Sequence, residues 1–162
     1  MFWKKKRVNE ISIDALYTQL IIFSYDIHDK ALEVDKETRY LEGKGEELYY
    51  HIVAASAMTA LAKLDDKYYG DYYQELMTRL NEKYTKVPVL AEHFNDVIRD
   101  KYEIKENGEE NLEDLIAYWL YFNVGSDNEE DFPKEFIPYA LAAKMIYGVY
   151  DRWFEKNNMP IK

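Results

Sequence analysis

The sequence contains no cysteine. This absence excludes a disulfide framework, a zinc site built on thiolates and a cysteine nucleophile. A chain without disulfides fits a reducing compartment, so we expect the protein to work in the cytoplasm.

Long apolar runs are also missing. The longest stretch without a formally charged side chain is 48–62, which is shorter than the roughly 20 apolar residues needed to span a bilayer. The basic residues near the start are followed by Asn9, Glu10 and Asp14 rather than by the apolar region of a signal peptide. We therefore expect neither a membrane-spanning helix nor export.

The first ten residues form a basic and aromatic segment with two possible interpretations. Phe2 and Trp3 stand beside Lys4, Lys5 and Lys6, a combination that suits lipid headgroups. A single cluster this short gives only weak anchoring. We favour a solvated terminus whose two aromatic rings pack back on the rest of the protein, with membrane contact as the less favoured alternative.

Motifs for catalysis are scarce. The sequence has no Gly-x-Ser-x-Gly nucleophile elbow and no phosphate-binding glycine loop. Its three histidines are His28, His51 and His93, and none follows a glutamate at the Glu-x-x-His spacing of di-metal helical bundles. We interpret His51 as a core histidine bonded to a neighbour, and we predict no metal site.

Asp65 and Asp66 resemble the start of the Asp-Asp-x-x-Asp step with which prenyl-diphosphate synthases bind magnesium. The next acid, Asp71, comes five residues after Asp66 and directly follows Gly70. We therefore predict a capped turn, in which Gly70 ends one helix and Asp71 caps the next. With no catalytic residue and no cofactor predicted, we expect the protein not to be an enzyme.

What the sequence does contain is helical periodicity. The stretch 46–69 is apolar nearly all round when it is drawn as a helix, which is typical of a buried helix. It is also rich in alanines, which let neighbouring helices approach closely. Other segments carry apolar residues at the i, i+3, i+4 spacing, and none alternates with a period of two for long enough to predict a strand.

These patterns predict an all-α fold. We expect a single domain over 1–162, with five or six mostly antiparallel helices around a buried central helix at about 46–69. The other helices are expected to start near Ser12, Asp71, Pro88, Asn111 and Pro133. Residues 32–45 either extend the first helix or form a loop, and the sequence leaves both open.

The charge is strongly negative and unevenly spread. The protein has 31 acidic and 21 basic residues, for a net charge of −10. The segment 100–135 holds 12 acids against Lys101, Lys105 and Lys134, so it carries a net −9 of that total. This sign argues against binding to nucleic acid, whose phosphates need basic groups.

Aromatic residues are abundant, with 16 tyrosines, and five bulky residues follow one another at 118–122. Successive residues on a helix point about 100° apart, so these five cannot all face a core. Aromatic rings flanked by carboxylates suit contact with a basic partner. The predicted partner-binding residues are Asp114, Tyr118, Trp119, Tyr121, Phe122, Asp127, Glu129, Glu130 and Asp131.

Together these features favour a non-enzymatic protein that acts by binding another protein. We expect a partner with a basic surface, such as a nuclease or another nucleic-acid-binding protein, and the role of an inhibitor, either an immunity or an anti-defence protein of bacteria or phage. Two alternatives remain. One is a helical metal- or diphosphate-binding enzyme that uses His28, His51, His93, Asp65 or Asp66. The other is a structural component that forms oligomers through tyrosine-rich faces.

Overall fold

The computed structural model describes the backbone of residues 2–104, 111–126, 130–157 and 159, and the side chains of 13–98, 111–126, 130–157 and 159. Within these ranges the chain forms six α-helices and no β-strand, so the all-α prediction is confirmed. The helices are α1 (Phe2–Val34), α2 (Gly45–Ala62), α3 (Asp66–Lys83), α4 (Val87–Ile104), α5 (Leu112–Val124) and α6 (Phe132–Lys156). Over the described residues, none of these helices combines the length and the apolar character needed to cross a membrane.

Helix α2 lies at the centre of the molecule and contacts each of the other five helices. All but one of its residues from Leu48 to Leu61 are buried. Ala54, Ala57 and Ala60 are completely inaccessible to solvent. Alanine side chains occupy little volume, so the surrounding helices can pack close to the α2 backbone at these positions. The prediction of a buried central helix is confirmed.

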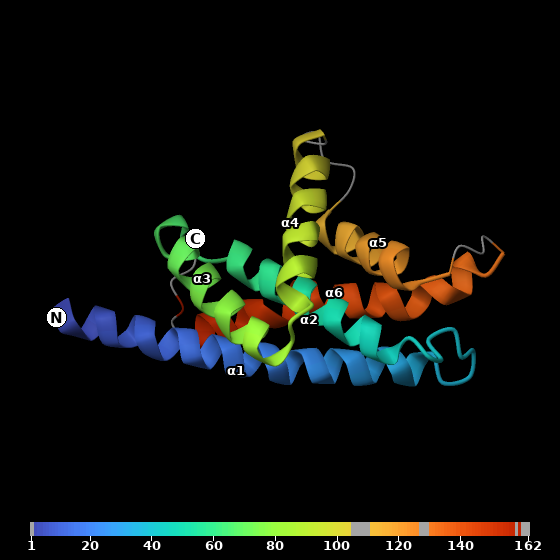
Figure 1. Ribbon diagram of the computed structural model, residues 1–162, viewed down its shortest axis with the longest axis horizontal. Helices are drawn as coiled ribbons and strands as arrows, with labels where there is room; N and C mark the ends of the chain where they lie inside the picture. The colour runs from blue at the N-terminus through green and yellow to red at the C-terminus, as the bar shows by residue number, and fades with distance from the viewer. Residues whose placement is uncertain (1, 105–110, 127–129, 158, 160–162) are drawn as a thin grey trace.

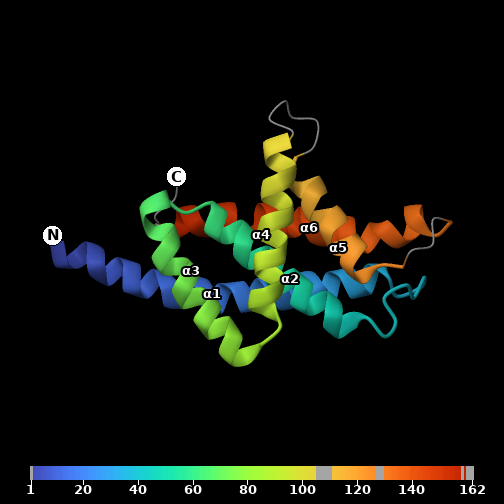
Figure 2. The same ribbon diagram turned by 45° about the horizontal axis from the view of Figure 1, so that its top comes forward.

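The other helices surround α2 on several sides (Figure 1). Helices α2 and α6 both run back along α1 in the opposite direction, and α5 packs against α6. Helix α4 crosses α2 steeply and projects beyond the layer of long helices in both views (Figure 2). Helix α1 is therefore antiparallel to both α2 and α6, whereas α2 and α6 run in the same direction and α4 departs from both arrangements.

The start of α1 differs from the prediction, and the structure answers the question that the sequence left open for the segment after it. The expected start at Ser12 is wrong, because α1 begins at Phe2 and no glycine or proline interrupts residues 2–11. Helix α1 continues to Val34, and residues 35–44 then form turns, which settles the question left open for 32–45.

Asp35 holds the turns that follow α1 together. Its side chain is 4% exposed. One carboxylate oxygen accepts hydrogen bonds from the Thr38 hydroxyl at 2.8 Å and the Tyr40 backbone N–H at 3.0 Å, and the other accepts from the Leu41 N–H at 2.6 Å. A carboxylate is an acceptor only, so one buried side chain satisfies three donors and directs the chain back toward α2.

The junction between α2 and α3 corrects another prediction. Helix α2 ends at Ala62 rather than at 69, and the side chain of Asp65 caps α3 by accepting from the Lys67 N–H at 3.2 Å. Gly70 and Asp71 therefore lie inside α3 instead of ending one helix and starting the next. An aspartate at the N-cap satisfies an otherwise unpaired helix N–H, while an interior glycine costs a helix only about 1 kcal/mol.

Predicted boundaries of the later helices agree better with the structure. The Asn111 side chain accepts from the Asp114 N–H at 2.9 Å and caps α5, as expected. Gly125 closes α5, and a Cβ atom there would lie 2.6 Å from the Tyr121 carbonyl oxygen. Pro88 lies in the first turn of α4 and Pro133 in the first turn of α6.

Candidate functional site

Two of the predicted partner-binding residues lie in the core. Trp119 is 3% exposed and Tyr121 is 6% exposed. Trp119 packs edge-on against Phe94 with ring centroids 5.0 Å apart, and its indole N–H donates to His93 Nδ1 at 3.1 Å. The Tyr121 hydroxyl donates to the Ser126 carbonyl at 3.0 Å. The expectation that these two rings form part of a surface is wrong, because neighbouring helices cover α5 on more than one side.

Other members of the predicted set do face outward. Phe122 is 67% exposed, Tyr118 is half-buried and Asp114 is exposed. These three residues are spaced four apart, so they form one stripe along α5, and the rings of Tyr118 and Phe122 stack at 5.9 Å. Near the start of α6, Glu130 is exposed and Asp131 is half-buried.

The remaining predicted residues lie outside the described part of the structure. They are Asp127 and Glu129 of the partner surface, and the side chains of Phe2, Trp3, Lys4, Lys5 and Lys6 of the basic segment.

The structure adds two aromatic residues that the sequence reading missed. The ring of Tyr118 lies 5.3 Å from that of Phe136, which stacks on Phe132 at 5.2 Å. With Phe122 this makes a continuous row of four rings over α5 and α6, which we call the aromatic ridge (Tyr118, Phe122, Phe132 and Phe136). The four-residue spacing of Phe132 and Phe136 in FPKEF was the available signal, since it places both rings on one helix face.

Glu135 is one of the 12 acids in the segment 100–135 but is not on the surface. Its side chain is completely buried, and its two carboxylate oxygens accept from the Ser126 backbone N–H and the Ser126 hydroxyl, each at 2.6 Å. Glu135 thereby ties the end of α5 to α6. Burial raises the pKa of the nearby Tyr139 hydroxyl above its ordinary value, and the negative charges of Glu135 and Asp35 raise it further.

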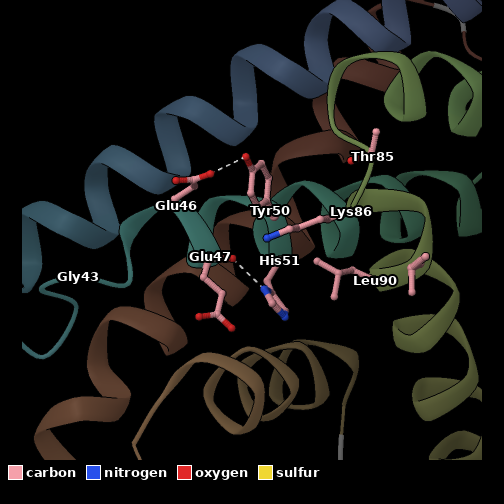
Figure 3. Close-up of a pocket in the computed structure, with 9 residues that line it drawn as sticks. Gly43, Glu46, Glu47, Tyr50, His51, Thr85, Lys86 and Leu90 are labelled. Carbon is pink, nitrogen blue, oxygen red and sulfur yellow. Dashed lines mark hydrogen bonds between the residues drawn. The ribbon is translucent and has the colours of Figure 1, made fainter.

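A second candidate site is a cavity of about 650 Å³ between the first turns of α2 and α4 (Figure 3). Its wall combines acidic, basic, aromatic and aliphatic side chains. The lining residues are Gly43, Glu46, Glu47, Tyr50, His51, Thr85, Lys86, Val89 and Leu90.

His51 is the most buried side chain of this wall, with 6% of its surface exposed. Its Nδ1 atom lies 2.7 Å from the Glu47 backbone carbonyl, which can only accept, so Nδ1 carries the proton. Its Nε2 atom has no hydrogen-bond partner among the described residues. Burial lowers the pKa of His51, although the Glu47 carbonyl and carboxylate partly oppose this, so the ring is neutral at neutral pH. The interpretation of His51 as a core histidine bonded to a neighbour is confirmed.

Tyr50 and Lys86 form the outer part of the same wall. The Tyr50 hydroxyl donates to the Glu46 carboxylate at 2.8 Å, and this bond raises the pKa of Tyr50. The Lys86 ammonium lies 5.9 Å from the centroid of the Tyr50 ring, within the range of a cation–π contact. Figure 3 shows the Lys86 side chain extended across the cavity toward Tyr50.

Among the residues considered for metal chemistry, His51 and His93 both pack against the Trp119 ring. Within the described ranges, no three histidine or acidic side chains are placed so that they could hold one metal ion. His28 Nε2 lies 2.7 Å from the Gly45 carbonyl, and His93 is engaged by Trp119. Asp65 serves as the cap of α3.

Comparison with known proteins adds no relative from which a role could be transferred. No protein-family model, no curated protein and no solved structure matches this chain.

Proposed function

We propose that this protein binds a basic protein partner through the aromatic ridge and the carboxylates beside it. The observation that carries the proposal is the continuous row of exposed and half-exposed rings over α5 and α6. Burial of these rings on a partner would be favourable by about 25 cal/mol for each Å² of apolar surface removed from water.

The charge around the ridge favours a cationic partner. Asp114 lies on the same stripe as Tyr118 and Phe122, and Glu130 is exposed just before the ridge continues into α6. Complementary charge accelerates encounter and disfavours partners of the same sign, while the rings supply affinity. A nuclease or another nucleic-acid-binding protein has such a basic surface. We therefore favour the role of a cytoplasmic inhibitor, of the immunity or anti-defence kind, over a catalytic role.

Affinity capture from the native host tests this proposal. We expect Phe122→Ser to abolish capture of a basic partner while the melting temperature stays nearly unchanged, because the ring is already 67% exposed. The matched control is Ile22→Ser on α1, where an isoleucine is 53% exposed and far in sequence from the ridge. We expect this variant to capture the partner as the wild type does.

The contribution of the carboxylates to partner binding is tested separately by the double variant Asp114→Lys with Glu130→Lys. Partner capture should fall sharply, and raised salt should release the partner from the wild type, because exposed charges are screened. The control is Glu33→Lys with Glu37→Lys, which reverses two exposed acids elsewhere. Equal capture by both double variants, or a captured partner with an acidic surface, would contradict the proposal.

A further inference from the structure

The cavity between α2 and α4 is separate from the aromatic ridge and has its own chemistry. We propose that this cavity binds a guanidinium group. The inference goes beyond the proposed partner face, and each could be right if the other were wrong.

The first argument is a hydrogen-bond acceptor in the cavity wall. His51 is 6% exposed, and with its proton on Nδ1 its Nε2 atom is an acceptor. No described residue donates to Nε2, so the N–H of a ligand could pair with this atom in place of water. A ligand that carries a donor therefore suits this wall.

The second argument is charge. Glu46 and Glu47 give the wall two carboxylates against the single ammonium of Lys86, so its formal charge is −1. Backbone N–H groups in the first turn of α2 favour negative charge at this end of the helix. The two glutamates of that turn already supply this negative charge. The wall therefore favours a cation over an anion.

The third argument is that a cation already occupies part of this space. The Lys86 ammonium faces the Tyr50 ring at 5.9 Å, and Lys86 is an exposed residue of the α3–α4 connection. A planar guanidinium stacks on an aromatic ring and presents five N–H donors in a fixed fork, whereas an ammonium presents three donors from one point. It could therefore contact Tyr50, a carboxylate and His51 together, in the place that Lys86 now takes.

Three soluble probes test the proposal on the full-length protein and distinguish the sources of the group. They are methylguanidinium, N-acetyl-arginine methylamide and its uncharged isostere N-acetyl-citrulline methylamide. Binding is followed by the shift of the His51 side-chain resonance in NMR spectra. We expect both charged probes to bind and the citrulline probe not to bind. Tighter binding of the blocked arginine would identify a peptide side chain as the source, and tighter binding of methylguanidinium a free small molecule.

Two substitutions in the wall have opposite expected effects. Glu47→Gln should weaken binding of the charged probes by about three- to tenfold, because one charge-assisted hydrogen bond is lost. Lys86→Ala should strengthen it, because the competing cation is gone. Glu33→Gln on α1 removes one exposed acid outside the cavity and should leave binding unchanged.

Melting curves of the variants check that each is folded. Equal binding of the citrulline probe would overturn the proposal, and so would no saturation by either charged probe up to about 10 mM. Weaker binding of the charged probes by Lys86→Ala would also overturn it, because Lys86 would then support the bound probe instead of competing with it.

Discussion

At the scale of single residues, the burial of His51 makes the stability of the fold depend on pH. Its ring is held within the most buried helix, and burial lowers its pKa below the ordinary histidine value. In the unfolded chain the same side chain takes up a proton near pH 6.5. The unfolded state therefore binds more protons than the folded state as the pH falls below that value, and acid favours unfolding.

The resulting prediction concerns the free energy of unfolding. The contribution of His51 should be fully present above about pH 6.5 and lost as the pH falls from there toward the folded-state pKa, with a slope of at most about 1.4 kcal/mol per pH unit. Urea unfolding at about pH 7 and pH 5.5 measures this difference. It should be smaller in His51→Leu, which has no titrating group at this position, and an identical difference in both proteins would refute the assignment.

The sequence could not predict which side chains of the candidate site face the solvent and which face the core. The run of five bulky residues at 118–122 implied that some face outward, and this is correct for Phe122. Which ones face inward depends on how many helices cover α5, and α2, α4 and α6 all contact it. Trp119 and Tyr121 are buried for that reason, and periodicity within one helix carries no information about its neighbours.

At the scale of helices, two signals that act within three or four residues were read correctly. Asn111 caps α5 through the N–H of Asp114, and Pro88 lies in the first turn of α4, as their positions predicted. The α2–α3 junction was misplaced because Asp71 was interpreted as the cap of the next helix, whereas Asp65 has that role in the structure. The apolar pattern of 46–69 continued past the true end of α2, so it gave no reason to prefer Asp65.

This junction gives a prediction with opposite signs at two positions of α3. Asp65→Ala should lower the free energy of unfolding by about 1 kcal/mol, because an N-cap is lost. Gly70→Ala should raise it by up to about 1 kcal/mol, because alanine is the better helix former and a Cβ atom there meets nothing within 4 Å. Urea unfolding measures both changes.

The contrasting control at this scale is Gly43→Ala. Gly43 has a φ of +79°, a backbone conformation that alanine adopts with strain, so this substitution should destabilise the protein. If Gly70→Ala destabilised the protein as much as Gly43→Ala, Gly70 would not lie inside a regular helix.

At the scale of the whole molecule, the central position of α2 predicts how the protein unfolds. Because α2 contacts every other helix, its amides should become accessible only when the whole fold opens. We expect hydrogen exchange in 52–60 to report the same free energy as urea unfolding. Amides near the projecting end of α4 should exchange much faster. Rapid exchange in the middle of α2 would contradict this view of the core.

The fold class and its central helix could be predicted from sequence because both depend on composition and periodicity along the chain. The steep crossing of α4 could not, because it depends on how side chains from distant segments fit together.

The alanines of α2 also constrain which substitutions this protein can accept during evolution. Five helices approach the same narrow surface, so a larger side chain there would have to be accommodated by several neighbours at once. Nor can α2 itself be removed, since each of the other five helices would lose the surface that it shares with α2. New features can therefore be added most easily at the periphery, in the turns of 35–44, at the projecting end of α4 and along the ridge.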